Sequence, residues 1–308
     1  MEDEQLGDRW RGALLGTALG DAVGRPFEGH AHVDRARVEA WLDAADQLTW
    51  TDDTAMTIAL SRSLIAQRGD IDPEQLGDAF ALAYRREPWR GYGAGPPQVF
   101  AAAAEGTSYV EAAAGLFGGS GSFGNGAAMR AAPVAVVGHD DPGRVAQLAR
   151  AQATVTHAHP LGQDGAALLA LSVWAVAATP HRAGADAIAD QLALLDTLEM
   201  RRAATAALDL APDGDAATIV ARLGNGIAAV EAVPAALAAF LRAPEEPRAV
   251  LAGAVALGGD TDTIAAMAGA LVGARVGASA LPRHFLGRLE GHEELIDLAD
   301  ALVHVTVT

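Results

Sequence analysis

The sequence predicts an all-α protein, and two observations support this fold class. The first is composition, because hydrophobic residues make up 51% of the chain but aromatic residues only 5%, with Ala, Leu and Val dominating. Ala and Leu are strong helix formers, whereas β-branched and aromatic residues lead in strands. The second is spacing, because apolar residues recur three and four positions apart and clean strand-like alternation is missing.

The expected helices follow one another along the whole chain. From the N-terminus onward, the spacing predicts helices at 6–23, 51–68, 73–85, 142–155, 161–178, 226–241, 248–257, 263–276 and 290–303. Segments rich in Gly and Pro interrupt the pattern at 24–29, 91–97, 118–126 and 258–259. Taken singly, each such segment is better explained as an ordinary loop than as a functional one. A chain of 308 residues buries roughly three quarters of its unfolded surface, so we expect one domain over residues 1–308.

The charge of the chain excludes some functions. Its formal net charge is -17, and Lys is absent, so every basic residue is Arg. Such a surface repels a duplex phosphate backbone, and we expect no direct binding of duplex nucleic acid. An anionic diphosphate substrate meets the same repulsion, which bound divalent cations would relieve.

Cysteine is absent, which excludes disulfides, thiolate metal sites and cysteine nucleophiles. The first eleven residues are charged rather than apolar, and no later stretch of about 18 apolar residues lacks a charge. We therefore expect a cytoplasmic protein that does not enter a membrane and acts as a monomer.

The first motif that could bind a metal or take part in catalysis opens the helix expected at 51–68. It reads Trp50-Thr51-Asp52-Asp53-Thr54. Capping accounts for one or two of these residues, because Thr or Asp accepts hydrogen bonds from free amides and Asp suits the helix dipole. Two adjacent carboxylates between two threonines exceed that need. Hard oxygen ligands at this density are typical of sites for Mg²⁺, Mn²⁺ or Ca²⁺.

The second motif repeats this design more than two hundred residues later, as Gly258-Gly259-Asp260-Thr261-Asp262-Thr263. Asp260 and Thr263 share one side of a first turn, and a non-helical Asp260 would let Asp262 converge with them. If the two helix starts face each other, their carboxylates repel, and two divalent ions about 3.5 to 4 Å apart would neutralise them. The alternating acidic loop of an EF-hand and the Gly-Lys-Ser/Thr ending of a P-loop are both missing.

We call these two motifs, residues 50–54 and 258–263, the acidic helix starts. Together with four further motifs, they resemble the ADP-ribosylglycohydrolase family, which includes the dinitrogenase-reductase-activating glycohydrolases and the vertebrate ADP-ribosyl-acceptor hydrolases. The motifs appear in the family's order across most of the chain: Gly12-Ala-Leu-Leu-Gly-Thr-Ala-Leu-Gly-Asp21-Ala-Val-Gly24 with Glu28, Thr51-Asp52-Asp53, Arg90-Gly-Tyr-Gly-Ala-Gly95, Gly121-Ser-Phe-Gly-Asn-Gly126 followed by Met129-Arg130, Thr156-His157, and Gly259-Asp260-Thr261-Asp262-Thr263.

The resemblance implies an orthogonal helical bundle with two Mg²⁺ ions at its centre, with Mn²⁺ as the alternative metal. It assigns Thr51, Asp52 and Asp53 to one ion, Asp260 and Thr263 to the other, and Asp262 to a bridge between them.

It also implies roles around the substrate. Glu28 resembles a mobile acidic residue that can contact a metal in the empty enzyme and acts on water or the leaving group when substrate enters, with Asp53 as a second candidate for proton transfer. Without the family, Glu28 is a solvated loop carboxylate. Phe117 and Phe123 correspond to residues that stack the adenine, and His157 to a pocket histidine. The other substrate-binding positions that the resemblance implies are Gly93, Gly95, Gly121, Ser122, Gly124 and Asn125.

Within the family, the segments at 90–95 and 121–126 resemble the type-three branch, which cleaves O-linked ADP-ribose from serine, poly(ADP-ribose) and O-acetyl-ADP-ribose. The implied activity is therefore Mg²⁺-dependent hydrolysis of an O-glycosidic bond. Two alternatives stay open. One is a hydrolase for an arginine or other ADP-ribosyl linkage. The other is a reader or toxin-immunity protein that binds ADP-ribose without turnover.

Overall fold

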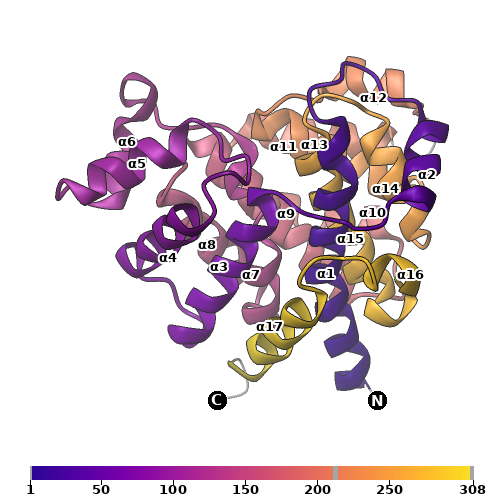
Figure 1. The fold of residues 1–308 in the computed structure, drawn as a ribbon, viewed down its shortest axis with the longest axis horizontal. Coiled ribbons are helices and arrows are strands. Elements are labelled where there is room, and N and C mark those ends of the chain that lie inside the picture. The colour runs from indigo at the N-terminus through magenta and orange to yellow at the C-terminus, as the bar shows by residue number, and fades with distance from the viewer. Residues whose placement is uncertain (1, 211–213, 306–308) are drawn as a thin grey trace.

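Helices and the loops that join them build the described structure, a computed structural model that covers residues 2–210 and 214–305 (Figure 1). Within those residues no β-strand forms, and extended pairing is limited to two isolated bridges, Leu48 with Leu289 and Gly124 with Ala228. The all-α prediction is confirmed.

Every helix that the spacing predicted is present, with ends that move by up to four residues. They are α1 (Glu2–Gly24), α3 (Asp52–Ala66), α4 (Pro73–Arg86), α8 (Pro142–Thr154), α9 (Pro160–Ala178), α13 (Ala229–Leu241), α14 (Pro247–Val255), α15 (Thr261–Val276) and α17 (His292–Val305).

The sequence pattern did not predict the remaining helices, which are α2 (Arg35–Ala44), α5 (Gly95–Ala104), α6 (Tyr109–Gly119), α7 (Ala132–Val137), α10 (Gly184–Ala189), α11 (Leu198–Leu210), α12 (Ala216–Leu223) and α16 (Arg283–Leu286). Short 3₁₀ turns lie at Arg25–Phe27, Asn125–Ala127, Leu192–Leu194 and Ala278–Ala280. Several of these helices are short, and α5 begins with Gly95-Pro96-Pro97, which looked like a break. Proline is tolerated there because the first amides of a helix have no intrahelical acceptor.

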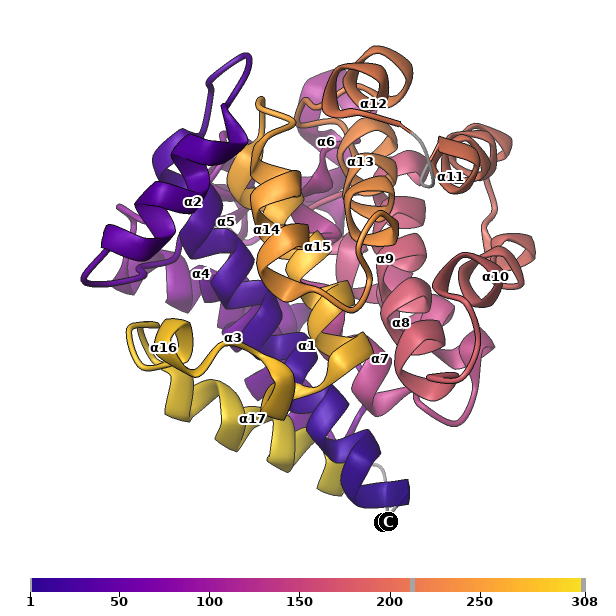
Figure 2. The same ribbon diagram turned by 90° about the vertical axis from the view of Figure 1, so that its right-hand side faces the viewer.

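Helices α1 and α15 lie side by side through the middle of the molecule (Figures 1 and 2). Their backbones touch because glycines line the contact at every fourth residue of α1. A Cβ atom on Gly16 would lie 2.0 Å from the carbonyl oxygen of Gly269, and one on Gly20 would lie 1.9 Å from that of Ala265. The contact brings the end of α1 beside the start of α15, where Thr261 Oγ1 donates to the Gly24 carbonyl at 2.9 Å.

Helix α9 is the one described helix whose length and composition would allow it to cross a membrane, but 78% of it is buried inside the fold. It packs against α8, α13 and α15 in a continuous apolar core. Its buried Asp164 forms an ion pair with Arg150 at 2.7 Å and accepts hydrogen bonds from Thr197. Burial in the core accounts for the apolar character of this helix.

Candidate active site

The first acidic start belongs to α3, and its side chains do not cap the helix. Thr51 is the N-cap residue, yet its side chain makes no capping hydrogen bond. By contrast, Asp34, Asp72, Ser108, Asp141 and Asp215 all accept hydrogen bonds from the first turns of their helices. The capping explanation therefore fails for Thr51.

A buried carboxylate from α1 takes the place of the cap. Asp21 is fully buried and accepts hydrogen bonds from the backbone amides and hydroxyl groups of both Thr51 and Thr54, over 2.6 to 3.0 Å. The amide of Asp52 donates to the Arg90 carbonyl at 2.9 Å. These contacts fix the first turn of α3 and leave Asp52 and Asp53 without a capping role.

The second acidic start belongs to α15 and is held mainly by backbone. Asp260 has a non-helical conformation (φ -85°, ψ 68°) and makes no capping hydrogen bond, as the convergence of the second motif requires. Its amide donates to the Asn225 carbonyl at 2.9 Å, and the Gly259 amide donates to the His30 carbonyl at 2.7 Å. Gly259 (φ +71°) permits this approach, because a Cβ atom there would lie 2.1 Å from the Asn225 carbonyl oxygen.

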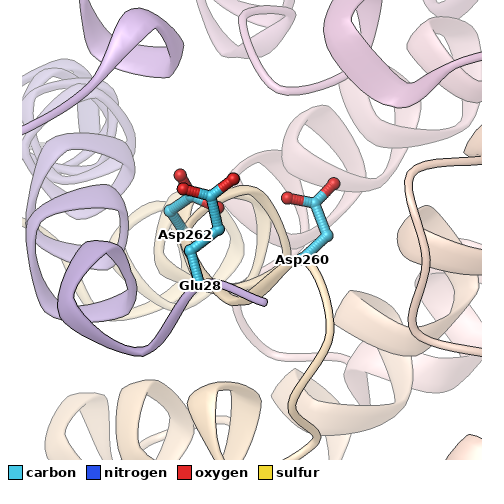
Figure 3. A group of neighbouring side chains, drawn as sticks. All are labelled: Glu28, Asp260 and Asp262. Carbon is cyan, nitrogen blue, oxygen red and sulfur yellow. The ribbon is translucent and has the colours of Figure 1, made fainter. Parts of the chain in front are cut away.

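The two starts meet. Thr263 Oγ1 lies 3.5 Å from Asp53 Oδ2, and Thr51 Oγ1 lies 3.2 Å from the same oxygen. Carboxylate oxygens of Glu28, Asp260 and Asp262 lie within 4.8 Å of one another, and Figure 3 shows the three groups extending to the same side of the α15 start. Both starts line one cavity of about 300 Å³.

The carboxylates of this cavity destabilise one another's charge. Burial and the neighbouring carboxylates raise the pKa of Asp52 to about 7 and that of Asp262 to about 9. Burial, together with Asp21, Asp262 and Asp52, raises the pKa of Asp53 well above its usual range. Partial burial and Asp260 raise the pKa of Glu28. The site therefore attracts positive charge.

The residues fit a divalent metal. Asp53 is buried, and its Oδ1 atom has no hydrogen-bond partner among the described residues. Leaving a buried carboxylate oxygen unpaired is costly, and a cation would satisfy it. The atoms available as metal ligands are carboxylate and hydroxyl oxygens, which Mg²⁺, Mn²⁺ and Ca²⁺ prefer.

A larger cavity of about 600 Å³ lies between α3 and α4 but has no comparable chemistry. Its two lining carboxylates are each paired with an arginine, Glu87 with Arg90 and Glu294 with Arg62.

Comparison with known proteins gives the same assignment as the motifs. The family model described as ADP-ribosylglycohydrolase matches residues 2–308. The chain belongs to the ADP-ribosylglycohydrolase family. It is therefore a hydrolase that acts on glycosidic bonds, in a family that depends on metal.

Similar relatives of this glycohydrolase include ADP-ribosylhydrolase ARH3 of Mus musculus and of Homo sapiens. Both are 36% identical over 340 residues, which cover 96% of this chain and 91% and 93% of theirs. An uncharacterized protein of Escherichia coli strain K12, YegU, is 30% identical and covers 94% of this chain and 93% of its own. A solved ADP-ribosylglycohydrolase-related protein complex superposes with a TM-score of 0.75 at 27% identity, over 99% of this chain and all of the matched one.

Most site residues predicted for the glycohydrolase line the cavity: Glu28, Asp52, Asp53, Gly93, Gly95, Phe117, Ser122, Gly124, Asn125, His157, Asp260, Asp262 and Thr263. Thr51 lies behind Asp53, against Asp21. Gly121 and Phe123 lie outside the lining, beside the segment that begins α9, and the Phe123 ring meets His159 edge-on at 5.8 Å.

Phe117 stands at the cavity with 59% of its surface exposed and a left-handed backbone (φ +53°). Such a conformation costs a non-glycine residue on the order of 1 kcal/mol or more, and strain of this kind clusters at functional sites. The only signal for this conformation in the sequence is the pair of glycines that follows Phe117.

Sequence reasoning missed several residues of the glycohydrolase site. Ile227 lines the cavity with 73% of its surface exposed, and Met56, Met129 and Arg130 form part of the wall. Asp21, Met129 and Arg130 appeared in the motifs without a role. A buried Asp at the end of an apolar helix was the available signal for Asp21, whereas an exposed Ile in a loop carries none.

Proposed function

We propose that this chain is a Mg²⁺-dependent hydrolase that cleaves the glycosidic bond between ADP-ribose and an oxygen acceptor, namely protein serine, poly(ADP-ribose) or O-acetyl-ADP-ribose. One observation carries the proposal: two acidic helix starts whose side chains cap neither helix meet in one cavity, with Thr263 Oγ1 3.5 Å from Asp53 Oδ2. The 36% identity to proteins named ADP-ribosylhydrolase ARH3 supports the linkage, as does the resemblance of 90–95 and 121–126 to the type-three branch.

Two Mg²⁺ ions, or Mn²⁺ in their place, would be held by the predicted ligands. Thr51, Asp52 and Asp53 would hold one ion, Asp260 and Thr263 would hold the other, and Asp262 would contribute to both. Such ions supply positive charge that offsets charge on oxygen in the transition state, and they lower the pKa of water.

The chain's own groups complete the site. The raised pKa of Glu28 is closer to the pH at which an enzyme works, where a carboxyl group can both accept and donate a proton. Glu28 is therefore the proposed proton-transfer group, and Asp53 is the second candidate. Asn125 Nδ2 donates to Asp260 Oδ2 at 2.6 Å and so orients one predicted ligand. Asp21 orients Thr51 by accepting a hydrogen bond from its hydroxyl group at 2.9 Å.

The remaining predicted contacts concern ADP-ribose. Exposed Phe117 and Phe123 would stack the adenine, and His157 would face the ligand from the cavity wall. Diphosphate and ribose would bind along Gly93, Gly95, Gly121, Ser122, Gly124 and Asn125, where backbone amides can approach closely. We also propose that the protein acts as a monomer.

The decisive experiment measures ADP-ribose release from defined linkages. Peptides modified on serine or on arginine, poly(ADP-ribose) and O-acetyl-ADP-ribose are each incubated with Mg²⁺, with Mn²⁺ and with a chelator. We expect release from the O-linked substrates and its loss with the chelator. Release from the arginine-linked peptide alone would contradict the O-linkage. Tight binding of ADP-ribose with no release from any substrate would identify a non-catalytic binding protein.

A further inference from the structure

His157 lies in the cavity wall with one ring nitrogen turned toward the glycine-rich loop. The side chain is 5% exposed. A Cβ atom on Gly126 would lie 2.9 Å from its Cε1 atom and 3.1 Å from its Nε2 atom, so glycine leaves the ring its space. The described residues offer Nε2 no hydrogen-bond partner. This nitrogen is therefore free to meet a ligand in the cavity.

The other ring nitrogen belongs to a buried hydrogen-bonded chain that begins at Arg130. Arg130 is fully buried, and its Nη2 atom donates to Thr156 Oγ1 at 2.8 Å. Its Nε atom donates to Gln152 Oε1 at 2.7 Å, while Gln152 Nε2 donates to the Ala127 carbonyl at 2.7 Å. The Gln152 amide can then face Arg130 only with its oxygen. A guanidinium group has donors and no acceptor, so Thr156 Oγ1 must accept from Arg130.

The hydroxyl proton of Thr156 then has one destination. Thr156 Oγ1 lies 2.8 Å from His157 Nδ1, and the described residues offer the proton no other acceptor. A hydroxyl that donates to Nδ1 requires that nitrogen to be unprotonated, which leaves the proton of a neutral ring on Nε2. Burial and the Arg130 charge also lower the pKa of His157 to about 3, so the ring stays neutral at physiological pH.

We propose that Arg130 and Thr156 are positioning residues that hold His157 as the neutral tautomer protonated on Nε2, so that this N–H donates to an oxygen of the ADP-ribosyl group. The identity of the ligand rests on the proposed function, whereas the tautomer does not. Fixing the proton before binding removes the cost of selecting a tautomer and makes the histidine reject a ligand that presents a donor at that point.

Nitrogen-15 NMR of the histidine side chains tests the tautomer directly, because protonated and unprotonated ring nitrogens have well-separated shifts. The His157 signals are assigned by their loss in His157→Gln. We expect Nε2 protonated and Nδ1 unprotonated in the wild type and in Thr156→Ser, and a mixture of tautomers in Thr156→Val. A wild-type ring protonated on Nδ1 would overturn the proposal, as would an unchanged single tautomer in Thr156→Val.

ADP-ribose binding tests the consequence. Losing one hydrogen bond should weaken binding by roughly twofold to tenfold, so Thr156→Val should raise KM by that factor with kcat nearly unchanged, and Thr156→Ser should restore it. His157→Gln, whose amide reaches the place of Nε2, should bind more tightly than His157→Asn, whose amide reaches only that of Nδ1. Equal affinities in this pair would contradict the donor role.

Failure of the proposed function looks different from failure of this inference. If the wild type neither binds ADP-ribose nor releases it from any linkage, the ligand is wrong, but the NMR result still decides the tautomer. If Thr156→Val does not fold, the wild-type spectrum and the Gln and Asn pair decide.

Discussion

The two acidic helix starts are similar in sequence but are held in place by different means. The start of α3 depends on a side chain from α1, because Asp21 accepts five hydrogen bonds from Thr51 and Thr54. The start of α15 depends on backbone, because Gly259 pairs with His30 and the Asp260 amide with Asn225. Removing the charge of Asp21 should therefore disturb the start of α3, whereas adding a side chain at a closely packed glycine should disturb the start of α15.

The largest effect is expected at Asp262, the proposed bridge between the two ions. Asp262→Ala should abolish Mg²⁺ binding, measured by calorimetry, and lower ADP-ribose release by at least on the order of a hundredfold, since even partners of metal ligands cost ten- to a hundredfold. Asp140→Ala, at a carboxylate that is 83% exposed, is the control. Retained Mg²⁺-dependent release in Asp262→Ala would refute the shared site.

Glu28 tests whether proton transfer can be separated from metal binding. Its segment pairs with the start of α15, since the Gly29 amide donates to the Gly259 carbonyl at 2.9 Å. Glu28→Gln keeps the shape but removes the titrating group, so kcat should fall on the order of a hundredfold or more. Calorimetry in the presence of ADP-ribose should find Mg²⁺ affinity nearly unchanged. A parallel loss of Mg²⁺ affinity would make Glu28 a ligand instead.

The substitution Asp21→Asn tests whether the Asp21 side chain holds the first turn of α3 in place. In Asp21→Asn the amide NH₂ faces donors, so part of the network breaks and the Thr51 hydroxyl loses its orientation. We expect Mg²⁺ affinity to fall about ten- to a hundredfold. Asp164→Asn is a matched control, because Asp164 is equally buried and accepts hydrogen bonds from Thr197 in front of α11, away from the cavity. The control should lose stability but keep its Mg²⁺ affinity; equal Mg²⁺ losses in both would argue against a local anchor.

The glycine contact tests the backbone anchor that places α15. Gly20→Ala would put a Cβ atom 1.9 Å from the Ala265 carbonyl oxygen, and such overpacking costs about 1–3 kcal/mol of unfolding free energy. Gly7→Ala lies in the same helix with open space around it and should stabilise the fold by up to about 1 kcal/mol. Urea denaturation measures both. Equal effects of the two changes would rule out the close contact.

A final prediction concerns pH in the absence of metal. The pKa values of Asp21, Asp52 and Asp262 are raised to about 6, 7 and 9, above the usual carboxyl value, so the fold binds more protons than the unfolded chain. The stability they contribute is present below the unfolded pKa and is lost as pH rises through these values. Thermal melts with a chelator should therefore show Tm falling across this range, and Mg²⁺ should restore it most at the upper end. A Tm that rises over this range without metal would contradict the raised pKa values.

The fold could be predicted where the pattern is local. Helices such as α3 and α9 repeat apolar residues over many turns, so their existence and approximate ends follow from 3.6-residue periodicity. Helix α5 was missed because Gly95-Pro96-Pro97 resembles a break, although proline suits a first turn. Helix α7 was missed because six residues carry too little periodicity.

The candidate site could be predicted where the sequence places more polar side chains at a helix start than capping requires. Two carboxylates between threonines are more than a cap needs, and this excess pointed to Asp52 and Asp53. No such excess marks Arg130 or Ile227. Arg130 acts on His157 through Thr156, 26 residues away, and Ile227 matters because its loop folds against Asn125. Contacts between distant segments leave no mark on either segment alone.

Residues a few positions apart are enough to specify that this chain forms helices and that two of them begin with more oxygen ligands than their own amides can use. That the two starts face each other follows from tertiary packing instead. This arrangement depends on glycines that bring α1 and α15 into backbone contact, and on Asp21, which fixes the first turn of α3 from a different helix. Both interactions exist only after distant segments pack together.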